Sequence, residues 1–267
     1  GSALHRLTAL PDADVRAMMQ RDCRCTGDFL RLLMEALVRR QGASRWAETT
    51  PAHLQYMREI KAQIPDALFV HVVRDGRDVA ASLSQLGWLY AYPFDRNRPA
   101  LPAAAYWDWL VRRGRAEGES LGGDYLEVHY EALVQEPRAT LARLAEFIEQ
   151  PLDYDTIQRT GVGSVARPNT SFPGATGGFH GRWRTELSPE DGAAVDALLG
   201  ETLTLFGYEP AGNGATAAVA ARRALYAARF TVRDWTKRWT PLARYATDLS
   251  LYAPHATPVT EEKLAGV

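Results

Sequence analysis

The sequence predicts an α/β fold in which helices flank a parallel central sheet and a helical extension follows at the C-terminal end. Helix-like and strand-like segments alternate along most of the chain, which is typical of parallel α/β architecture. Residues 68–73 form a continuous apolar, β-branched run, as in a strand buried on both faces. Residues 211–216 are rich in Gly, Ala and Asn and precede a separate helical segment.

Composition agrees with a globular chain. The 267 residues are 46% hydrophobic and 24% charged, with a net charge of −1. These values exclude disordered and collagen-like chains, and they argue against a globally basic nucleic-acid-binding protein. No run of 18 apolar residues occurs, so no membrane-spanning helix is predicted.

Apolar spacing and turn residues predict the elements in order. Apolar residues at a spacing of 3.6, with breaks at Pro and Gly, predict helices at 12–22, 27–41, 52–64, 79–86, 103–120, 137–148 and 188–206. β-Branched and alternating apolar runs predict strands at 68–73 and 125–130. Ser188 is expected to cap the last of these helices, with Pro189 in its first turn. Residues 160–181 are rich in Gly, Pro, Ser, Thr and Asn and are expected to form a long loop, of the kind that is usually functional or mobile.

Two parts are expected: an α/β domain over 1–210, and a linker with a basic helical tail over 211–267. Within 217–253, seven basic and two acidic residues give a net charge of +5, and aromatic residues are interleaved with them. Such a helix can lie on an anionic membrane surface or bind an acidic partner. Alternatively, it packs its apolar stripe on the core and leaves its arginines solvated.

The two cysteines, Cys23 and Cys25, form neither a disulfide framework nor a zinc site with neighbouring ligands. This favours a reducing compartment, and we expect a cytoplasmic protein, with peripheral membrane contact if the tail binds lipid. The chain starts with Gly-Ser rather than Met, which indicates a cloning scar or a start inside a longer protein.

The sharpest local feature is the strand 68–73 followed by Arg74 and, eight residues later, Ser82. Ligands of open α/β sheets bind beyond the carboxyl ends of the strands. Arg74 can hold a phosphate there with paired charge-assisted hydrogen bonds, and Ser82 on the next helix can add a hydroxyl. The alternative is that the run from Arg74 to Asp78 is a solvated charge cluster with internal ion pairs.

Three ordered blocks carry a resemblance to the sulfotransferase family, closest to its bacterial and tyrosylprotein-type branch. The blocks are RWAETTPAHLQYMREIKAQIPDALFVHVVRDGRDVAASLSQLGW (45–88), YLEVHYEALVQEPRATLARLAEFIEQPL (125–152) and GFHGRWRTELSPEDGAAVDALLGETLTLFGY (178–208). The resemblance implies a P-loop-like fold and transfer of a sulfuryl group from 3′-phosphoadenylyl sulfate (PAPS) to a hydroxyl or amine of a glycan, lipid, small molecule or peptide. It implies no metal and no nucleic-acid partner.

The resemblance also implies roles for individual residues. Arg74 and Ser82 match the pair that holds the 3′-phosphate of PAPS. Tyr130, at the end of a strand, matches the aromatic residue that contacts the adenine or its ribose phosphate; otherwise it is a core tyrosine. In the late basic loop, Arg182 matches a phosphate contact and Trp183 a packing residue; otherwise this is a charged helix entry with a buried Trp.

The sequence departs from the family pattern twice. The family's first strand and its Pro-Arg-Ser-Gly-Thr-Thr-like loop, which binds the 5′-phosphosulfate, have no counterpart, so we expect them upstream of Gly1. Thr49 stands where many relatives have a lysine that steadies the leaving oxygen. A hydroxyl supplies no positive charge, so either Arg74 or Arg77 substitutes for it, or this branch works differently, or activity is low.

Glu48 and His53 flank this second departure and are candidate general bases for an acceptor hydroxyl. The alternatives are that Glu48 caps a backbone turn and that His53 merely lies in the first turn of its helix. His71, in the middle of a strand, is expected to be a core histidine. No His, Cys and carboxylate set shows metal-ligand spacing.

Three functions follow from these observations. The first is a PAPS-dependent sulfotransferase. The second is an impaired pseudoenzyme that binds a nucleotide or a partner. The third is another nucleotide-binding transferase, such as a kinase-like protein, against which the absence of a Gly-x-x-x-x-Gly-Lys-Ser/Thr loop argues.

Overall fold

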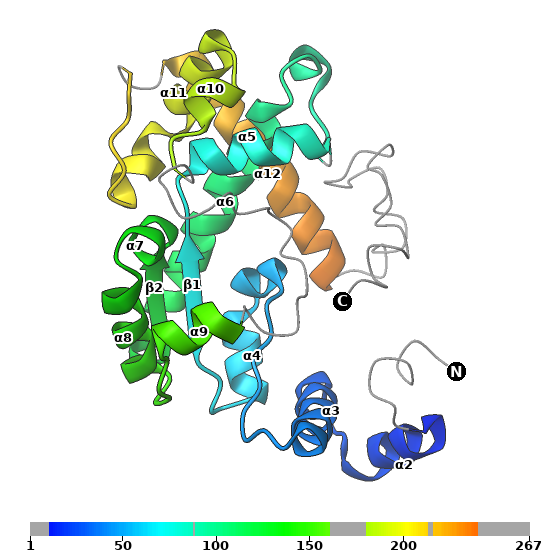
Figure 1. Ribbon diagram of the computed structural model, residues 1–267. Helices are drawn as coiled ribbons and strands as arrows, with labels where there is room; N and C mark the ends of the chain where they lie inside the picture. The colour runs from blue at the N-terminus through cyan, green and yellow to red at the C-terminus, as the bar shows by residue number, and fades with distance from the viewer. Residues whose placement is uncertain (1–10, 88, 161–179, 213–215, 240–267) are drawn as a thin grey trace. The chain divides into compact units, whose positions relative to one another are not determined.

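The computed structural model describes residues 11–87, 89–160, 180–212 and 216–239 (Figure 1). Contacts divide the chain into two compact units, each with its own helices. The first unit holds residues 1–70 and 113–126, and the second holds residues 71–112 and 127–267. Long parts of two segments predicted to be loop or tail, 161–179 and 240–253, lie outside the described residues.

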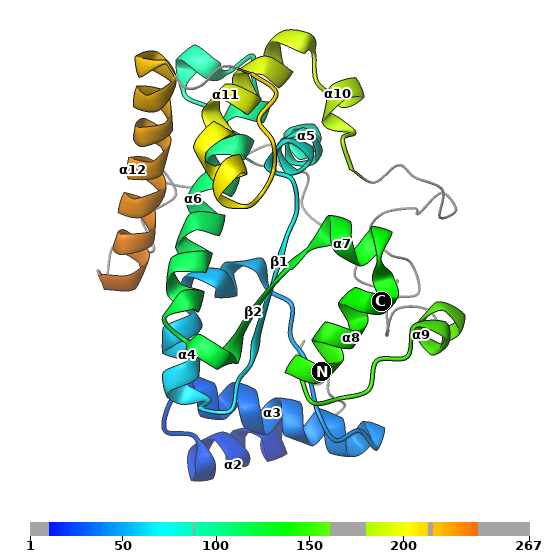
Figure 2. The ribbon, with the colours of Figure 1, turned by 90° about the vertical axis from the view of Figure 1, so that its left-hand side faces the viewer.

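The sheet consists of two parallel strands among the described residues. Strand β1 (Phe69–Val73) pairs with β2 (Tyr125–His129), and the two arrows lie side by side in Figures 1 and 2. Because the strands are parallel, their carboxyl ends lie at the same edge. The α/β class predicted from the sequence is therefore confirmed.

The first unit is helical. Its helices are α2 (Asp12–Asp22), α3 (Thr26–Gln41), the 3-10 helix η1 (Pro51–Gln55), α4 (Met57–Gln63), the end of α6 (Ala100–Glu119) and the 3-10 helix η3 (Gly122–Asp124). The single helix predicted over 52–64 is wrong, because Tyr56 interrupts it with φ −134° and ψ 18°. Pro51 at the start of η1 fixes the turn that leads into this pair of helices.

The second unit contains most of the other helices. They are α5 (Gly76–Leu86), the 3-10 helix η2 (Pro93–Asp95), the first part of α6, α7 (Tyr130–Gln135), α8 (Pro137–Phe147), α9 (Tyr154–Thr160), α10 (Trp183–Glu186), α11 (Pro189–Leu205) and α12 (Ala217–Trp239). The short helices α7, α9 and α10 were not predicted. Tyr130 was expected to end a strand; instead it is the first residue of α7, directly after β2.

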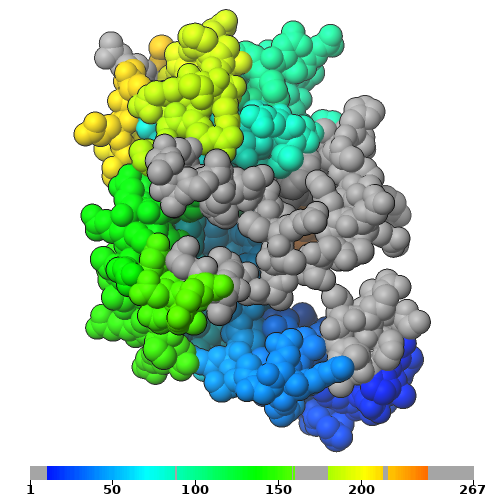
Figure 3. All heavy atoms as spheres, viewed as in Figure 1, coloured from blue at the N-terminus to red at the C-terminus, as the bar shows by residue number. Residues whose placement is uncertain are grey.

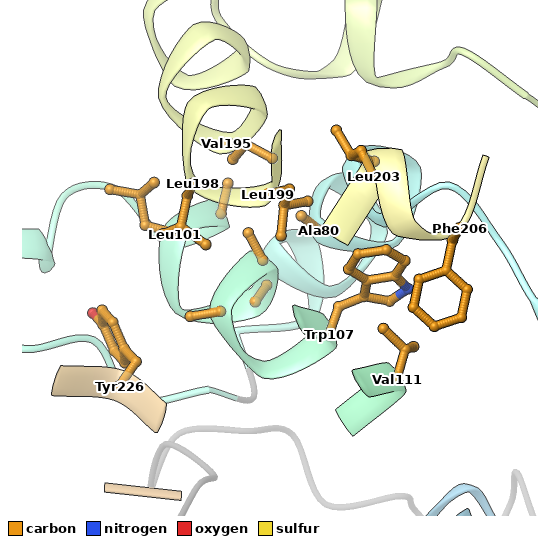
Figure 4. Close-up of a cluster of buried hydrophobic side chains, with 14 of the residues drawn as sticks. Ala80, Leu101, Trp107, Val111, Val195, Leu198, Leu199, Leu203, Phe206 and Tyr226 are labelled. Carbon is orange, nitrogen blue, oxygen red and sulfur yellow. The ribbon is translucent and has the colours of Figure 1, made fainter. Parts of the chain in front are cut away.

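The core of the second unit lies where α5, α6, α11 and α12 meet (Figure 4). Trp107, Leu199 and Phe206 are among its buried members. The side chain of Ser188 accepts a hydrogen bond from the Asp191 amide, so the predicted cap of α11 is confirmed. In Figure 3 the yellow-green atoms of α10 and α11 lie against the cyan atoms of α5, with which both helices are in contact.

One glycine explains how α5 comes so close to this core. A Cβ on Gly76 would lie 2.4 Å from the Trp107 ring, so only glycine fits at the first residue of α5. The turn between β1 and α5 is therefore packed directly on the core.

Helix α12 belongs to the second unit and packs on its core. Tyr226 and Phe230 are buried there, the Tyr226 hydroxyl donates to Asp95 at 3.1 Å, and the Trp109 indole donates to Thr231 at 3.1 Å. Of the alternatives for the tail, packing on the core therefore holds for residues 217–239. The expectation that its arginines are solvated is wrong for Arg222 and Arg223, which are partly buried and form ion pairs with Asp95 and Glu201 of the same unit.

Candidate functional site

Arg74 and Tyr130 meet at the carboxyl edge of the sheet. Arg74 directly follows β1, and Tyr130 directly follows β2. The Arg74 guanidinium carbon lies 5.1 Å from the centre of the Tyr130 ring, within the range of a cation–π contact. The parallel pairing of the strands brings these two predicted residues together, although they are 56 positions apart in the chain.

Glu131 ties the two strand ends to each other. One oxygen of its carboxylate accepts from the Asp75 backbone N–H at 2.9 Å, and the other accepts from the Tyr208 hydroxyl at 2.8 Å. Burial, together with the nearby charge of Glu131, raises the pKa of Tyr208 well above its ordinary value. Tyr208 therefore remains a protonated donor, and the residues beside Arg74 and Tyr130 are held in place.

Asp78 fixes the late basic loop to the start of α5. Its two carboxylate oxygens accept from the backbone N–H groups of Gly181 at 2.8 Å and Trp183 at 2.9 Å. Arg74 lies 3.7 Å from the same carboxylate. Gly181 has φ +77°, a left-handed conformation that favours glycine. The turn around Arg74 and the loop at 181–183 thus share one buried carboxylate.

The buried environment of Asp78 disfavours the ionised form of its carboxyl group. Burial raises the pKa of Asp78 above its ordinary value, although the two backbone donors and Arg74 oppose this effect. The two backbone N–H donors and Arg74 therefore offset part of the cost of burying the Asp78 carboxylate.

Replacing Asp78 by asparagine tests this role. We expect Asp78→Asn to lower the free energy of unfolding by about 1–3 kcal/mol, because an amide turns one donor toward a backbone N–H and leaves that group unpaired. Urea unfolding monitored by tryptophan fluorescence measures the change. The matched control is Asp153→Asn, since Asp153 accepts a backbone hydrogen bond from Thr156 at 2.7 Å on an exposed turn. Equal losses of unfolding free energy in the two variants would show that the burial of Asp78 does not increase the contribution of its hydrogen bonds to stability.

Arg77 is the buried centre of the charge run. It is 4% exposed, donates to Asp75 and Asp196 at 2.8 Å and 2.7 Å, and also donates to the Glu209 carbonyl at 3.0 Å. Burial alone would lower the pKa of Arg77, but the hydrogen bonds and charges of Asp75 and Asp196 raise it overall. From Asp75 to Asp78 the run is thus buried rather than solvated, while its internal ion pairs exist.

This arrangement also removes one alternative from the sequence analysis. Arg77 was a candidate to replace the charge of the lysine missing at Thr49. Its guanidinium is committed to two carboxylates and a carbonyl and is shielded from solvent. Of the two arginines considered, Arg74 is the one with solvent access.

The other predicted nucleotide-binding residues are dispersed around this centre. The side chain of Ser82 is exposed on α5 and is not part of the contacts that join Arg74 to Tyr130 and Asp78. Arg182 precedes α10 and forms an ion pair with Glu186. Trp183 is buried, and the guanidinium carbons of Arg77 and Arg184 lie 4.7 Å and 4.6 Å from its ring centre.

In the first unit, Glu48 and His53 are joined directly. His53 Nδ1 lies 2.7 Å from a Glu48 oxygen. An ionised carboxylate can only accept, so this bond places the proton on Nδ1 and leaves Nε2 able to take a proton. Glu48 also accepts from the Thr50 backbone N–H at 3.1 Å and from the Thr50 hydroxyl, so it caps the turn as well. The interpretation of Glu48 as the cap of a turn is therefore confirmed, and its role as a general base stays a prediction.

Sequence reasoning missed the residues that hold the site. Asp78, Glu131, Asp196 and Tyr208 were not singled out as site residues, because their partners lie far away in the chain. Tyr208 and Glu131 are 77 positions apart, and Arg77 and Asp196 are 119 apart. A signal was present for Asp78, whose carboxylate lies four residues after Arg74 on the same helix entry.

Metal ligation and membrane crossing were also considered. Within the described ranges, no group of three or more His, Cys, Asp or Glu side chains is arranged to hold a metal ion. Cys23 and Cys25 are both free thiols. None of the helices in the described part of the chain combines the length and apolar character needed to cross a membrane.

The arrangement at the sheet edge is suited to an anionic ligand that carries a flat ring. It offers a partly exposed guanidinium beside an aromatic ring, at the strand ends where ligands of α/β sheets bind. Comparison with known proteins identifies the family. A model of the sulfotransferase family matches residues 4–154, which is more than half of the chain and extends upstream of the blocks that carried the resemblance. No curated protein matches the chain. The match and the fold show that the chain belongs to the sulfotransferase family.

Proposed function

We propose that this protein transfers a sulfuryl group from PAPS to a hydroxyl or amine of an acceptor such as a glycan, lipid, small molecule or peptide. The observation that carries the proposal is the contact between Arg74 and Tyr130 at the carboxyl edge of the sheet. A guanidinium and an aromatic ring at this place fit the phosphate and the base of an adenine nucleotide.

Each nucleotide-binding residue has a role in this proposal. Arg74 binds the 3′-phosphate, and the exposed hydroxyl of Ser82, further along α5, adds a donor. Tyr130 packs against the adenosine portion. Arg182 supplies a second cation from the loop that Asp78 holds, and the buried Trp183 supports that loop.

The pair of Glu48 and His53 is the proposed base. When PAPS is bound, it supplies the sulfuryl group and a nucleotide as leaving group. His53 Nε2 takes the proton of the acceptor hydroxyl, while Glu48 holds the ring in the required tautomer. Thr50 donates twice to Glu48 and keeps its carboxylate in place.

The binding half of this proposal is tested by calorimetry with 3′,5′-bisphosphoadenosine. We expect Arg74→Ala to weaken binding by about 1.5–3 kcal/mol, the value of a charged hydrogen-bonded contact. The control is Arg138→Ala, which removes an exposed arginine that is paired with Asp155 at 2.6 Å in the same unit. If both variants bind the nucleotide as tightly as the wild type, the assignment of Arg74 is wrong.

The catalytic half is tested with radiolabelled PAPS and a panel of glycans, lipids and peptides. Transfer to any of them that depends on Arg74 supports the enzyme. Tight nucleotide binding without transfer or donor hydrolysis favours the pseudoenzyme, for which the exposed Thr49 and the committed Arg77 are the specific observations.

A further inference from the structure

Helix α12 presents an apolar face to solvent on the side opposite the core. At 3.6 residues per turn, one stripe of the helix faces away from Tyr226 and Phe230. Its members are all exposed: Ala221, Ala224, Leu225, Ala228, Val232, Trp235 and Trp239. Trp235 is 56% exposed and Trp239 is 73% exposed. This apolar stripe contains no charged residue.

Basic residues on the flank of α12 and on its core side fasten the helix to the rest of the second unit. Arg222 lies 3.3 Å from Asp95, Arg223 lies 2.6 Å from Glu201, and Arg229 donates to the Tyr90 carbonyl at 3.0 Å. Figure 2 shows α12 lying along α6, the side on which Trp109 bonds to Thr231. The helix is therefore held in one orientation, with its apolar stripe turned outward.

Positive charge exceeds negative charge on α12. The helix has six basic residues and one acidic residue, Asp234, so its own net charge is +5. Arg222 and Arg223 pair with Asp95 and Glu201 of the same unit, and Glu201 also pairs with Arg112. Lys237 is exposed on the side of the helix opposite the two tryptophans, and burial together with Arg233 lowers its pKa from the ordinary value.

We propose that the apolar stripe of α12 docks on the surface of an anionic lipid bilayer, with the helix lying in the plane of the interface. Tryptophan suits this position because its apolar ring and its N–H group match the boundary between acyl chains and headgroups. The apolar stripe matches the acyl chains of the bilayer, and the excess of positive charge on the helix matches its anionic headgroups.

A second copy of the helix fits the stripe less well. Pairing two stripes would bring two groups with the same excess of positive charge together, and like charges repel across an interface. Anionic headgroups attract the same charges. Because the helix is already folded on the core, docking requires no ordering of the chain.

The experiment is flotation of the whole chain with vesicles of phosphatidylcholine, with or without phosphatidylglycerol. We expect binding to the vesicles that contain phosphatidylglycerol, with a blue shift of tryptophan emission. The double variant Trp235→Ser, Trp239→Ser should lower partitioning by about tenfold or more, because two large apolar side chains are lost from the contact. Lys237→Glu should lower it only for the anionic vesicles.

The matched control is Leu205→Ser, which removes a 48% exposed apolar side chain of α11 in the same unit. This variant should bind vesicles like the wild type. Failure of the wild type to float with anionic vesicles, or equal losses in the control and the tryptophan variant, overturns the proposal. Dimers in light scattering without lipid that the tryptophan substitutions abolish would also overturn it in favour of a second copy. Nucleotide calorimetry on the same samples reports separately on the sulfotransferase site.

Discussion

Replacing Arg77 by alanine should lower the free energy of unfolding by about 3–5 kcal/mol, because it leaves buried carboxylates without their cation. Asp75 and Asp196 both lose their partner, and Asp196 is then held only by the backbone N–H groups of Ala211 and Gly212 at 2.9 Å each. The loss also removes one of the two cations that lie over the Trp183 ring. Urea unfolding of the wild type and the variant measures the change.

The control for this experiment is Arg184→Ala. The Arg184 guanidinium lies 4.6 Å from the same Trp183 ring, but its side chain is exposed. We expect a much smaller loss of stability there, since exposed cations contribute little. A third variant, Arg77→Lys, keeps the charge but cannot bridge two carboxylates, and it should fall between the other two. If Arg77→Ala and Arg184→Ala unfold at the same urea concentration, the buried ion pairs do not stabilise the protein.

Replacing His53 by glutamine should lower kcat for sulfuryl transfer by about 10²–10⁴-fold, the usual contribution of a general base. The affinity for 3′,5′-bisphosphoadenosine should not change, because the residues proposed to bind it belong to the other unit. Glu48→Gln should lower kcat as well, since an amide can also offer a donor to Nδ1 and no longer fixes the tautomer.

Glu59→Gln is the control for the substitution of Glu48, because Glu59 is an exposed carboxylate on the neighbouring helix α4. Its kcat should equal that of the wild type. A kcat for His53→Gln equal to that of the wild type would show that another group takes the proton of the acceptor.

Local patterns were enough to predict most of the fold. Helix α2 has the predicted bounds, 12–22, and β1 begins one residue later than predicted, because both depend on local spacing and on breaks at Pro11 and Pro65. The meeting of Arg74 and Tyr130 also follows from the sequence, since parallel strands end at one edge.

The rest could not be predicted because it depends on distant partners. Nothing near Arg77 in the chain indicates that Asp196 and the Glu209 carbonyl enclose it. Helix α12 shows another limit. Tyr226 with Phe230 and Trp235 with Trp239 form two apolar stripes at helical spacing, and only the packing decides which one faces the core.

The bonds around Arg77 also have a consequence for the order of events during synthesis. The turn that carries Arg74 and Arg77 is made early, yet the Arg77 guanidinium donates to Asp196 and to the Glu209 carbonyl, which lie 119 and 132 positions later in the chain. A nascent chain that has emerged only as far as α9 has already formed both strand segments but still lacks these partners. The surroundings of Arg77 are therefore completed only after residue 209 has emerged from the ribosome, and until then its charge remains open to water.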